Sequence, residues 1–314
     1  MQPDAVLLFF FIGFYILIKG AGFLVDGATS FAKKFNISNI VVGLIVVGIG
    51  TSIPEFAISF IANLLEQKEI GLGTVIGSNI FNILFILGFC AILFPLTLKE
   101  IWVKRDLVWN IGAVLLSIVL VVDGKISRLD GLLMFAAFMF WLKSVIKENE
   151  EIQSNQQDEK ISFHLLAWPM AIFMMLAGFL GVILGGKWVV DGATALARNF
   201  GMSEALIGLT IIGIGTSLPE LAVAATAAYK KEPGIAVGSI IGSNIFDFLM
   251  ILGTSALVKP IIFPKNMFFD IAVTLFATIL LYIFMFTGQR HTLKRFEGFV
   301  FIAIYIAYIT FVVS

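Results

Sequence analysis

Charged and reactive residues are scarce in this chain of 314 residues. Only 13% of its residues are Asp, Glu, Lys or Arg and the formal net charge is zero, so the sequence offers no basic face for nucleic acid. Cys90 is the single cysteine, which excludes an internal disulfide, and the two histidines, His164 and His291, stand at no metal-binding spacing. No activated nucleophile accompanies a base, so we expect no enzyme.

Apolar residues dominate the composition instead. They make up 59% of the chain, which contains 32 phenylalanines. So little polar surface cannot cover a soluble globule, whereas a bilayer requires roughly 20 apolar residues for each helical crossing. We therefore expect an all-α polytopic protein of the cell membrane, with the first apolar run retained as a span because no cationic region precedes it. Apolar runs bounded by charges predict ten spans, at about 5–25, 40–65, 70–96, 106–123, 128–146, 163–190, 205–229, 235–258, 267–287 and 295–313.

Two polar motifs occur twice. GIGTSIPEFA at Gly48–Ala57 returns as GIGTSLPELA at Gly213–Ala222, and GSNIFN at Gly77–Asn82 returns as GSNIFD at Gly242–Asp247. Every residue number in the second copy exceeds its counterpart by 165, and about half of the positions around the motifs are identical without any insertion. Polar, helix-breaking motifs repeated inside apolar sequence indicate one site built from two copies of one half.

Five predicted spans fall in each half of the chain, and this odd number determines the topology. The second half must enter the membrane from the opposite side, so we predict two inverted five-helix repeats. The loops after spans 1, 3, 5, 7 and 9 hold 13 Lys and Arg residues and the other loops hold six, which places the first set in the cytoplasm and both termini outside. The predicted units are a first repeat at 1–146 with its motif region at 43–88, a charged cytoplasmic linker at 147–162, and a second repeat at 163–314 with its motif region at 208–253.

In the first copy, Gly48 and Pro54 interrupt the helix near the middle of its span. Proline has no N–H for the carbonyl four residues earlier, and unpaired backbone groups persist at bilayer depth only where they line a cavity or meet an ion. Thr51, Ser52 and Glu55 share one helical face just after the break. A carboxylate at the bilayer centre costs roughly 2.5 to 3.5 kcal/mol on insertion scales, so we expect Glu55 to bind something.

The second motif and the second copy complete a set of oxygen donors. Ser78 and Asn82 lie four residues apart in the first repeat, and inversion brings the middles of the four motif spans together. Carboxylates, hydroxyls and an amide without His or Cys suit the hard cations Ca²⁺ and Na⁺. For the single hydroxyls, helix packing remains an alternative. The counterparts in the second repeat are Thr216, Ser217, Glu220, Ser243 and Asp247.

Other polar residues match across the repeats with less clear roles. Asp26 and Asp191 correspond, and Lys187 precedes Asp191 by four residues as a local ion-pair partner, which favours structural anchoring near the ends of spans 1 and 6. Asn79 and Asn244 also correspond. Their position leaves helix–helix bonding and support of the site as equal alternatives.

The motif pairs GTSIPE with GSNIFN and GTSLPE with GSNIFD resemble the two alpha repeats of the sodium/calcium exchangers in the cation/calcium antiporter superfamily. The resemblance extends over nearly the whole chain and corresponds to the compact prokaryotic type, with discontinuous helices at the midplane. It implies ion ligands from the side chains of Thr51, Ser52, Glu55, Ser78, Asn82, Thr216, Ser217, Glu220, Ser243 and Asp247, and from the carbonyls of Gly48 and Gly213.

The resemblance also implies an activity. Na⁺ and Ca²⁺ are then the transported substrates, exchanged by alternating access, with the Na⁺ gradient driving Ca²⁺ extrusion. The Thr-Ser pair before Pro-Glu in both copies favours Na⁺ coupling over H⁺ coupling, and Glu220 in place of Asp disfavours K⁺ dependence, although both stay alternatives. The inverted, discontinuous helices disfavour a cation channel. We expect no cofactor, no nucleic acid and no obligatory protein partner.

Overall fold

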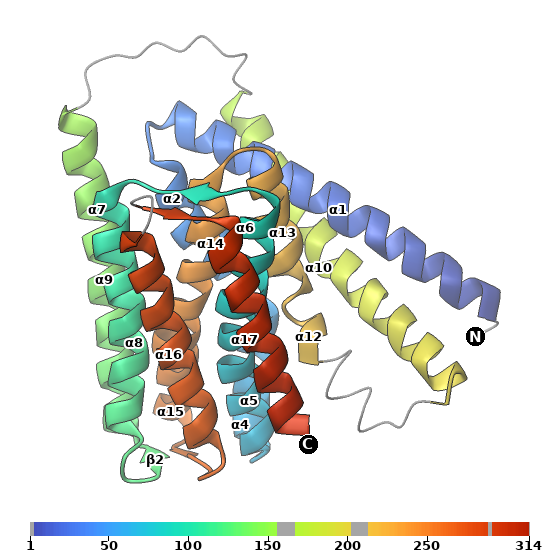
Figure 1. Cartoon of the computed structure of the whole chain (residues 1–314), viewed down its shortest axis with the longest axis vertical. Helices are drawn as coiled ribbons and strands as arrows, with labels where there is room; N and C mark the ends of the chain where they lie inside the picture. The colour runs from blue at the N-terminus through green and yellow to red at the C-terminus, as the bar shows by residue number, and fades with distance from the viewer. Residues whose placement is uncertain (1–2, 156–166, 202–212, 288–290, 314) are drawn as a thin grey trace.

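Helices make up nearly all of the protein. The computed structural model describes residues 3–155, 167–201, 213–287 and 291–313 (Figure 1). In the first half, with η marking π-helical segments, the elements are α1 (Pro3–Lys34), α2 (Asn39–Val41), η1 (Val42–Gly48), α3 (Ile49–Thr51), α4 (Ile53–Leu64), α5 (Lys68–Ile80), η2 (Phe81–Leu87), α6 (Gly88–Leu93), β1 (Leu96–Thr97), α7 (Glu100–Trp102), η3 (Val103–Leu107), α8 (Val108–Leu120), β2 (Lys125–Ile126) and α9 (Arg128–Asn155). In the second half they are α10 (Trp168–Asn199), α12 (Gly213–Gly215), α13 (Leu218–Tyr229), α14 (Pro233–Ile245), η5 (Phe246–Ile251), α15 (Leu252–Val258), β3 (Ile261–Ile262), α16 (Met267–Phe286), β4 (Thr292–Leu293) and α17 (Arg295–Val313).

The described helices follow the predicted spans. Seven of them are long and apolar enough to cross a bilayer, and the bent pair Asn39–Thr51 and Ile53–Leu64 forms an eighth crossing. The predicted span at 106–123 corresponds to α8 and the end of η3. Parts of the predicted spans at 163–190 and 205–229, of the linker at 147–162 and of the motif region at 208–253 lie outside the described residues.

Three helices are longer than the sequence predicted. α1 ends at Lys34 and α10 at Asn199, whereas we expected ends near residues 25 and 190. α9 ends at Asn155 instead of near residue 146, so the first part of the predicted linker at 147–162 is helical. The DGAT segments continue the helices because no proline interrupts them, so Asp26 and Asp191 lie inside helices and not near their ends. A helix of 32 residues is about 48 Å long and exceeds the roughly 30 Å of the hydrocarbon core. Figure 1 shows α1 and α10 lying obliquely side by side.

Glycines bring α1 and α10 into close contact. A Cβ atom added to Gly20 would lie 2.7 Å from the backbone nitrogen of Val182, and one added to Gly185 would lie 2.4 Å from that of Leu17. Neither position can hold a larger side chain without separating the helices, as is typical of tightly packed membrane helices. The two long helices therefore form one pair beside the upright bundle (Figure 1).

The span formed by α2, η1, α3 and α4 is broken at Ser52. Its two parts differ in direction by 46°. Ser52 has φ −80° and ψ 5°, and Pro54 stands in the first turn of α4, where its missing N–H leaves no helical bond unmade. The same geometry recurs before α13, with Ser217 at φ −92° and ψ 7° and Pro219 in the first turn. The predicted discontinuous helices are therefore present in both repeats.

Two short ribbons at opposite ends of the bundle display the inversion of the repeats. β1 and β3 stand at equivalent positions, with Leu96 corresponding to Ile261. β1 pairs with β4 from the second half, and β3 pairs with β2 from the first half, both antiparallel. In Figure 1 the β1–β4 ribbon lies at the upper end and β2 at the lower end. Equivalent strands thus lie on opposite sides of the protein, as inverted repeats require.

Candidate cation site

The two GSN motifs lie on the most buried of the described apolar spans. In one stretch of 18 residues within Glu69–Leu93, 78% of the residues are buried in the protein, and in the corresponding stretch of Pro233–Val258 the share is 94%. Both helices change from α to π geometry within the motif, at Phe81 and Phe246, and π turns inside α-helices are frequent at functional sites. The next residue in each case, Asn82 or Asp247, is fully buried. The sequence therefore folds these polar side chains into the centre of the protein.

Amide contacts join the two motifs across the repeats. The Nδ2 atom of Asn79 donates to Oδ2 of Asp247 at 2.9 Å, and the Ser78 hydroxyl reaches the same oxygen at 3.3 Å. The Nδ2 atom of Asn82 donates to Oδ1 of Asn244 at 3.0 Å. These contacts are equivalent under the repeat, since 79 corresponds to 244 and 82 to 247. Asn79 and Asn244, whose role the sequence left open, therefore bond across the repeats and contact predicted site residues.

The carbonyl of Gly48 forms a second connection between the repeats. The Ser243 hydroxyl donates to this oxygen at 3.0 Å, although the two residues stand 195 positions apart in the chain. The Thr51 hydroxyl lies 3.2 Å from the same carbonyl and 3.1 Å from that of Val47. The end of the first half-helix thus directs a carbonyl towards hydroxyls from both repeats.

Glu55 and Glu220 occupy equivalent places in the first turns of α4 and α13, and each side chain is only 1% exposed. The partial positive charge of a helix N-terminus favours a carboxylate there. Glu55 lies near the carboxyl groups of Glu220 and Asp247 and near the Thr216 hydroxyl, and Glu220 lies near Asp247 and the Thr51 hydroxyl. Each glutamate therefore faces the threonine of the opposite repeat, and the carboxyl groups converge on one region.

Many oxygens in this region have no hydrogen-bond partner among the described residues. Buried polar atoms are nearly always paired, and an unpaired one costs about 1–3 kcal/mol, more if it is charged. A cluster of unpaired oxygens therefore requires a group that can satisfy them. These atoms are both carboxyl oxygens of Glu55 and of Glu220, the Oδ1 atoms of Asp247, Asn79 and Asn82, and the hydroxyls of Ser52 and Ser217.

The chemistry of these donors suits a hard cation held by mixed oxygen ligands. Within the described part of the chain, no group of three or more His, Cys, Asp or Glu side chains is arranged to hold a metal ion by itself. Carboxyl groups would therefore supply only part of a coordination shell, and neutral hydroxyl, amide and carbonyl oxygens the remainder. Ca²⁺ accepts such mixtures, with six to eight oxygens at flexible geometry.

Most of the predicted site residues gather in this region, together with Asn79 and Asn244. Ser52 lies near Asp247, and Ser217 is fully buried at the second break. Gly213 belongs to the described part of α12. Asn79 and Asn244 complete the constellation, and their match across the repeats was the sequence signal for them. The structure thus connects Gly48, Thr51, Ser52, Glu55, Ser78 and Asn82 with Thr216, Glu220, Ser243 and Asp247 through the contacts above.

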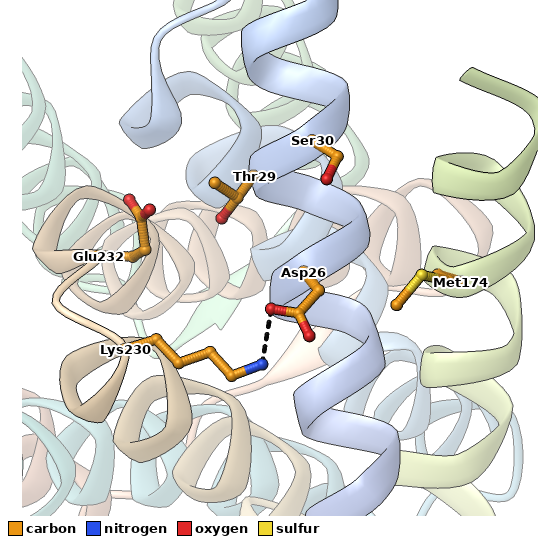
Figure 2. A pocket seen from close by; sticks show the side chains of 6 residues that line it. All are labelled: Asp26, Thr29, Ser30, Met174, Lys230 and Glu232. Atoms are coloured by element: carbon orange, nitrogen blue, oxygen red, sulfur yellow. Dashed lines mark hydrogen bonds and ion pairs between the residues drawn. The ribbon is translucent and has the colours of Figure 1, made fainter. Parts of the chain in front are cut away.

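A separate pocket of about 550 Å³ lies between α1, α10 and the α13–α14 connection (Figure 2). Within it, the Lys230 ammonium contacts Asp26 at 2.6 Å and the Gly22 carbonyl at 3.1 Å. Asp191, the counterpart of Asp26, pairs at 2.6 Å with Lys187 of its own helix, as the sequence predicted. Asp26 instead joins α1 to α13. The lining residues are Asp26, Thr29, Ser30, Met174, Lys230 and Glu232.

Comparison with known proteins agrees with this arrangement. The profile of the family described as "Sodium/calcium exchanger protein" matches residues 5–147 and 170–314, nearly the whole chain. The chain belongs to the sodium/calcium exchanger family. One relative is the inner membrane protein YrbG of Escherichia coli, which is 36% identical over 255 residues that cover 79% of this chain and 78% of YrbG. The sodium/calcium exchanger MaX1 of Methanosarcina acetivorans is 30% identical, with 96% of this chain and 97% of MaX1 covered.

Solved structures support the same assignment at the level of the fold. A structure of the sodium-calcium exchanger NCX_Mj superposes with a TM-score of 0.84 at 30% identity, covering 98% of each chain. As a member of the sodium/calcium exchanger family with a matching fold, the protein is a multi-pass membrane antiporter for Ca²⁺ and other cations. The family is one of transporters and not of enzymes.

Proposed function

We propose that this exchanger is a secondary antiporter that moves Na⁺ and Ca²⁺ in opposite directions by alternating access, with the Na⁺ gradient driving Ca²⁺ extrusion. One observation carries the proposal: buried carboxyl, hydroxyl and amide oxygens of both repeats meet at the centre of the helices without hydrogen-bond partners among the described residues. Hard cations satisfy such oxygens, and both Na⁺ and Ca²⁺ are hard cations of similar size.

The ligands proposed for these ions come from both repeats. Glu55 and Glu220 supply the symmetric negative charge that a divalent ion balances. The hydroxyls next to them supply neutral oxygens, which suit a monovalent ion and have no proton to exchange near neutral pH. The full set is the carbonyls of Gly48 and Gly213 and the side chains of Thr51, Ser52, Glu55, Ser78, Asn82, Thr216, Ser217, Glu220, Ser243 and Asp247.

Strict exchange follows from the shared site. When the site is empty, its carboxylates stay uncompensated in surroundings of low dielectric, so the empty carrier crosses rarely. One cation species must therefore replace the other before the site faces the opposite side. We expect the closely packed pair of α1 and α10 to move across the bundle as one body during this step.

Uptake of ⁴⁵Ca²⁺ into proteoliposomes tests the coupling ion directly. Vesicles are preloaded with Na⁺, with K⁺, or with a pH gradient alone, and each is diluted into medium that contains Ca²⁺. We expect Na⁺ inside the vesicles to support uptake and the other two conditions to give less than a tenth of that rate. Equal uptake from the pH gradient would assign H⁺ exchange instead, and uptake that needs Na⁺ and K⁺ together would assign K⁺-dependent exchange.

A cation channel is the second candidate, because rings of oxygens also line selective pores. The two functions differ in coupling. A channel passes Ca²⁺ without any cation on the opposite side, whereas an antiporter requires one. Omitting every internal cation that can exchange, with the membrane potential clamped, therefore separates them: uptake that persists would assign a channel.

A further inference from the structure

The two equivalent amide contacts in the site have opposite hydrogen-bond polarity. Asn79 donates its Nδ2 to Oδ2 of Asp247, whereas Asn244 accepts, through its Oδ1, the Nδ2 of Asn82. All four side chains are at most 1% exposed, so water cannot replace either contact. One amide residue type thus serves as a donor in one repeat and as an acceptor in the other.

Each contact leaves one oxygen of its partner unused. Oδ2 of Asp247 is occupied by Asn79 and Ser78, and Oδ1 of Asp247 has no partner among the described residues. Nδ2 of Asn82 is occupied by Asn244, and Oδ1 of Asn82 is likewise unpaired. The free oxygen is therefore the Oδ1 atom in both cases, at equivalent places in the two repeats.

We propose that Asn79 and Asn244 are positioning residues, which orient Asp247 and Asn82 so that one oxygen of each faces the transported ion. Asn79 donates a hydrogen bond to the carboxyl group of Asp247, and Asn244 accepts one from the amide of Asn82. The proposal deepens the function proposed above and rests on it.

The orientation of Asn79 is determined on two sides. Its Nδ2 also donates to the carbonyl of Val75, one helical turn earlier, at 2.7 Å. Both neighbours of this nitrogen are thus acceptors. An aspartate at position 79 has the same shape but no N–H. When ionised it can only accept, and when protonated it has a single O–H donor for the two acceptors, the Val75 carbonyl and Asp247. An aspartate at position 244 keeps the acceptor that Asn82 uses.

The same substitution at equivalent positions therefore tests the inference. Asn79→Asp and Asn244→Asp each add one carboxyl group without changing side-chain volume, so packing and added charge are matched. We expect Asn79→Asp to weaken the apparent affinity for Ca²⁺ at least tenfold, and Asn244→Asp to weaken it clearly less, because only the second variant keeps the atom that its partner uses. Affinity is measured from the rise in unfolding temperature with Ca²⁺ concentration in purified full-length protein.

A second substitution supplies a rescue. Asp247→Asn gives position 247 an N–H group, which can donate to an aspartate at position 79 and restore the contact with reversed polarity. The double variant with Asn79→Asp should therefore return to within threefold of Asp247→Asn alone, whereas Asp247→Asn should not improve Asn244→Asp. A purely structural role for Asn79 does not produce this selectivity.

The outcomes separate clearly. Equal losses for the two single variants, or no rescue by Asp247→Asn, would overturn the inference. If Asn79→Asp yields no monodisperse protein, recovery of folded protein in the double variant supports it and continued failure contradicts it. If the unmodified protein shows no stabilisation by Ca²⁺, the proposed function fails instead, and the unfolding temperatures without Ca²⁺ still test the contacts through the same order of variants.

Discussion

The tight contact of Gly242 with the opposite repeat gives a prediction that can be worked from the geometry. A Cβ atom at this position would lie 2.1 Å from the carbonyl oxygen of Leu44 and 2.7 Å from the Cα of Leu44. These are backbone atoms of η1, which cannot rotate away as a side chain can. For Gly242→Ala to fit, α14 and η1 must separate by about 1 Å, since interiors are close-packed and overpacking is relieved only by backbone shifts.

A shift of this size also affects the site. Ser243 follows Gly242 directly and donates to the carbonyl of Gly48 at 3.0 Å. A separation of about 1 Å would lengthen this hydrogen bond to about 4 Å, which is too long for it to persist. We expect Gly242→Ala to lower the free energy of unfolding by about 1–3 kcal/mol, the usual cost of overpacking, and to reduce Na⁺-driven Ca²⁺ uptake at least tenfold.

Thermal unfolding in detergent and ⁴⁵Ca²⁺ uptake at equal protein incorporation measure the two effects. The matched control is Gly112→Ala in α8, where an added Cβ meets no atom within 4 Å among the described residues. Alanine is favoured over glycine in a helix by about 1 kcal/mol, so this variant should be as stable as the original protein or more so. A Gly242→Ala protein with unchanged unfolding temperature and uptake would refute the close packing described here.

Three further predictions follow from the site and its surroundings. Glu55→Gln should reduce Na⁺-driven uptake at least a hundredfold, whereas Asp247→Asn, which reproduces the amide of the first repeat, should keep measurable transport; equally inactive variants would show that the Asp247 charge is essential. In a background without the native cysteine, cysteines at Glu66 and Lys231 should label from outside and inside respectively, and labelling from one side would contradict the inversion. Burial raises the pKa of Glu232, although a lysine and an asparagine amide oppose the shift. The folded protein therefore favours the neutral form of this carboxyl group. The stability that the group contributes is fully present below its ordinary pKa and is lost as the pH rises through the raised pKa. Glu232→Gln should therefore flatten the fall in unfolding temperature with rising pH, and an unchanged slope would contradict this assignment.

Much of the fold was predictable because its causes are local or repeated. Pro54 and Pro219 lack an N–H wherever they stand, so the breaks before α4 and α13 could be located from the sequence. The ends of α1 and α10 could not be located from the sequence, because both helices continue past the expected bilayer boundary. The length of a helix beyond that boundary depends on tertiary packing. The site donors were predictable as a set because buried polar residues stand out in apolar sequence.

The sequence by itself determined the membrane class, the inverted repeats, the breaks and the residue types at the centre, since apolar content, an odd number of spans and proline act without reference to distant partners. Tertiary structure alone decided the partners: Ser243 with Gly48, Asn79 with Asp247, and Lys230 with Asp26. Each of these pairs joins residues more than 160 positions apart. Such contacts arise when two helices cross at one register, and neither segment carries a local signature of the other.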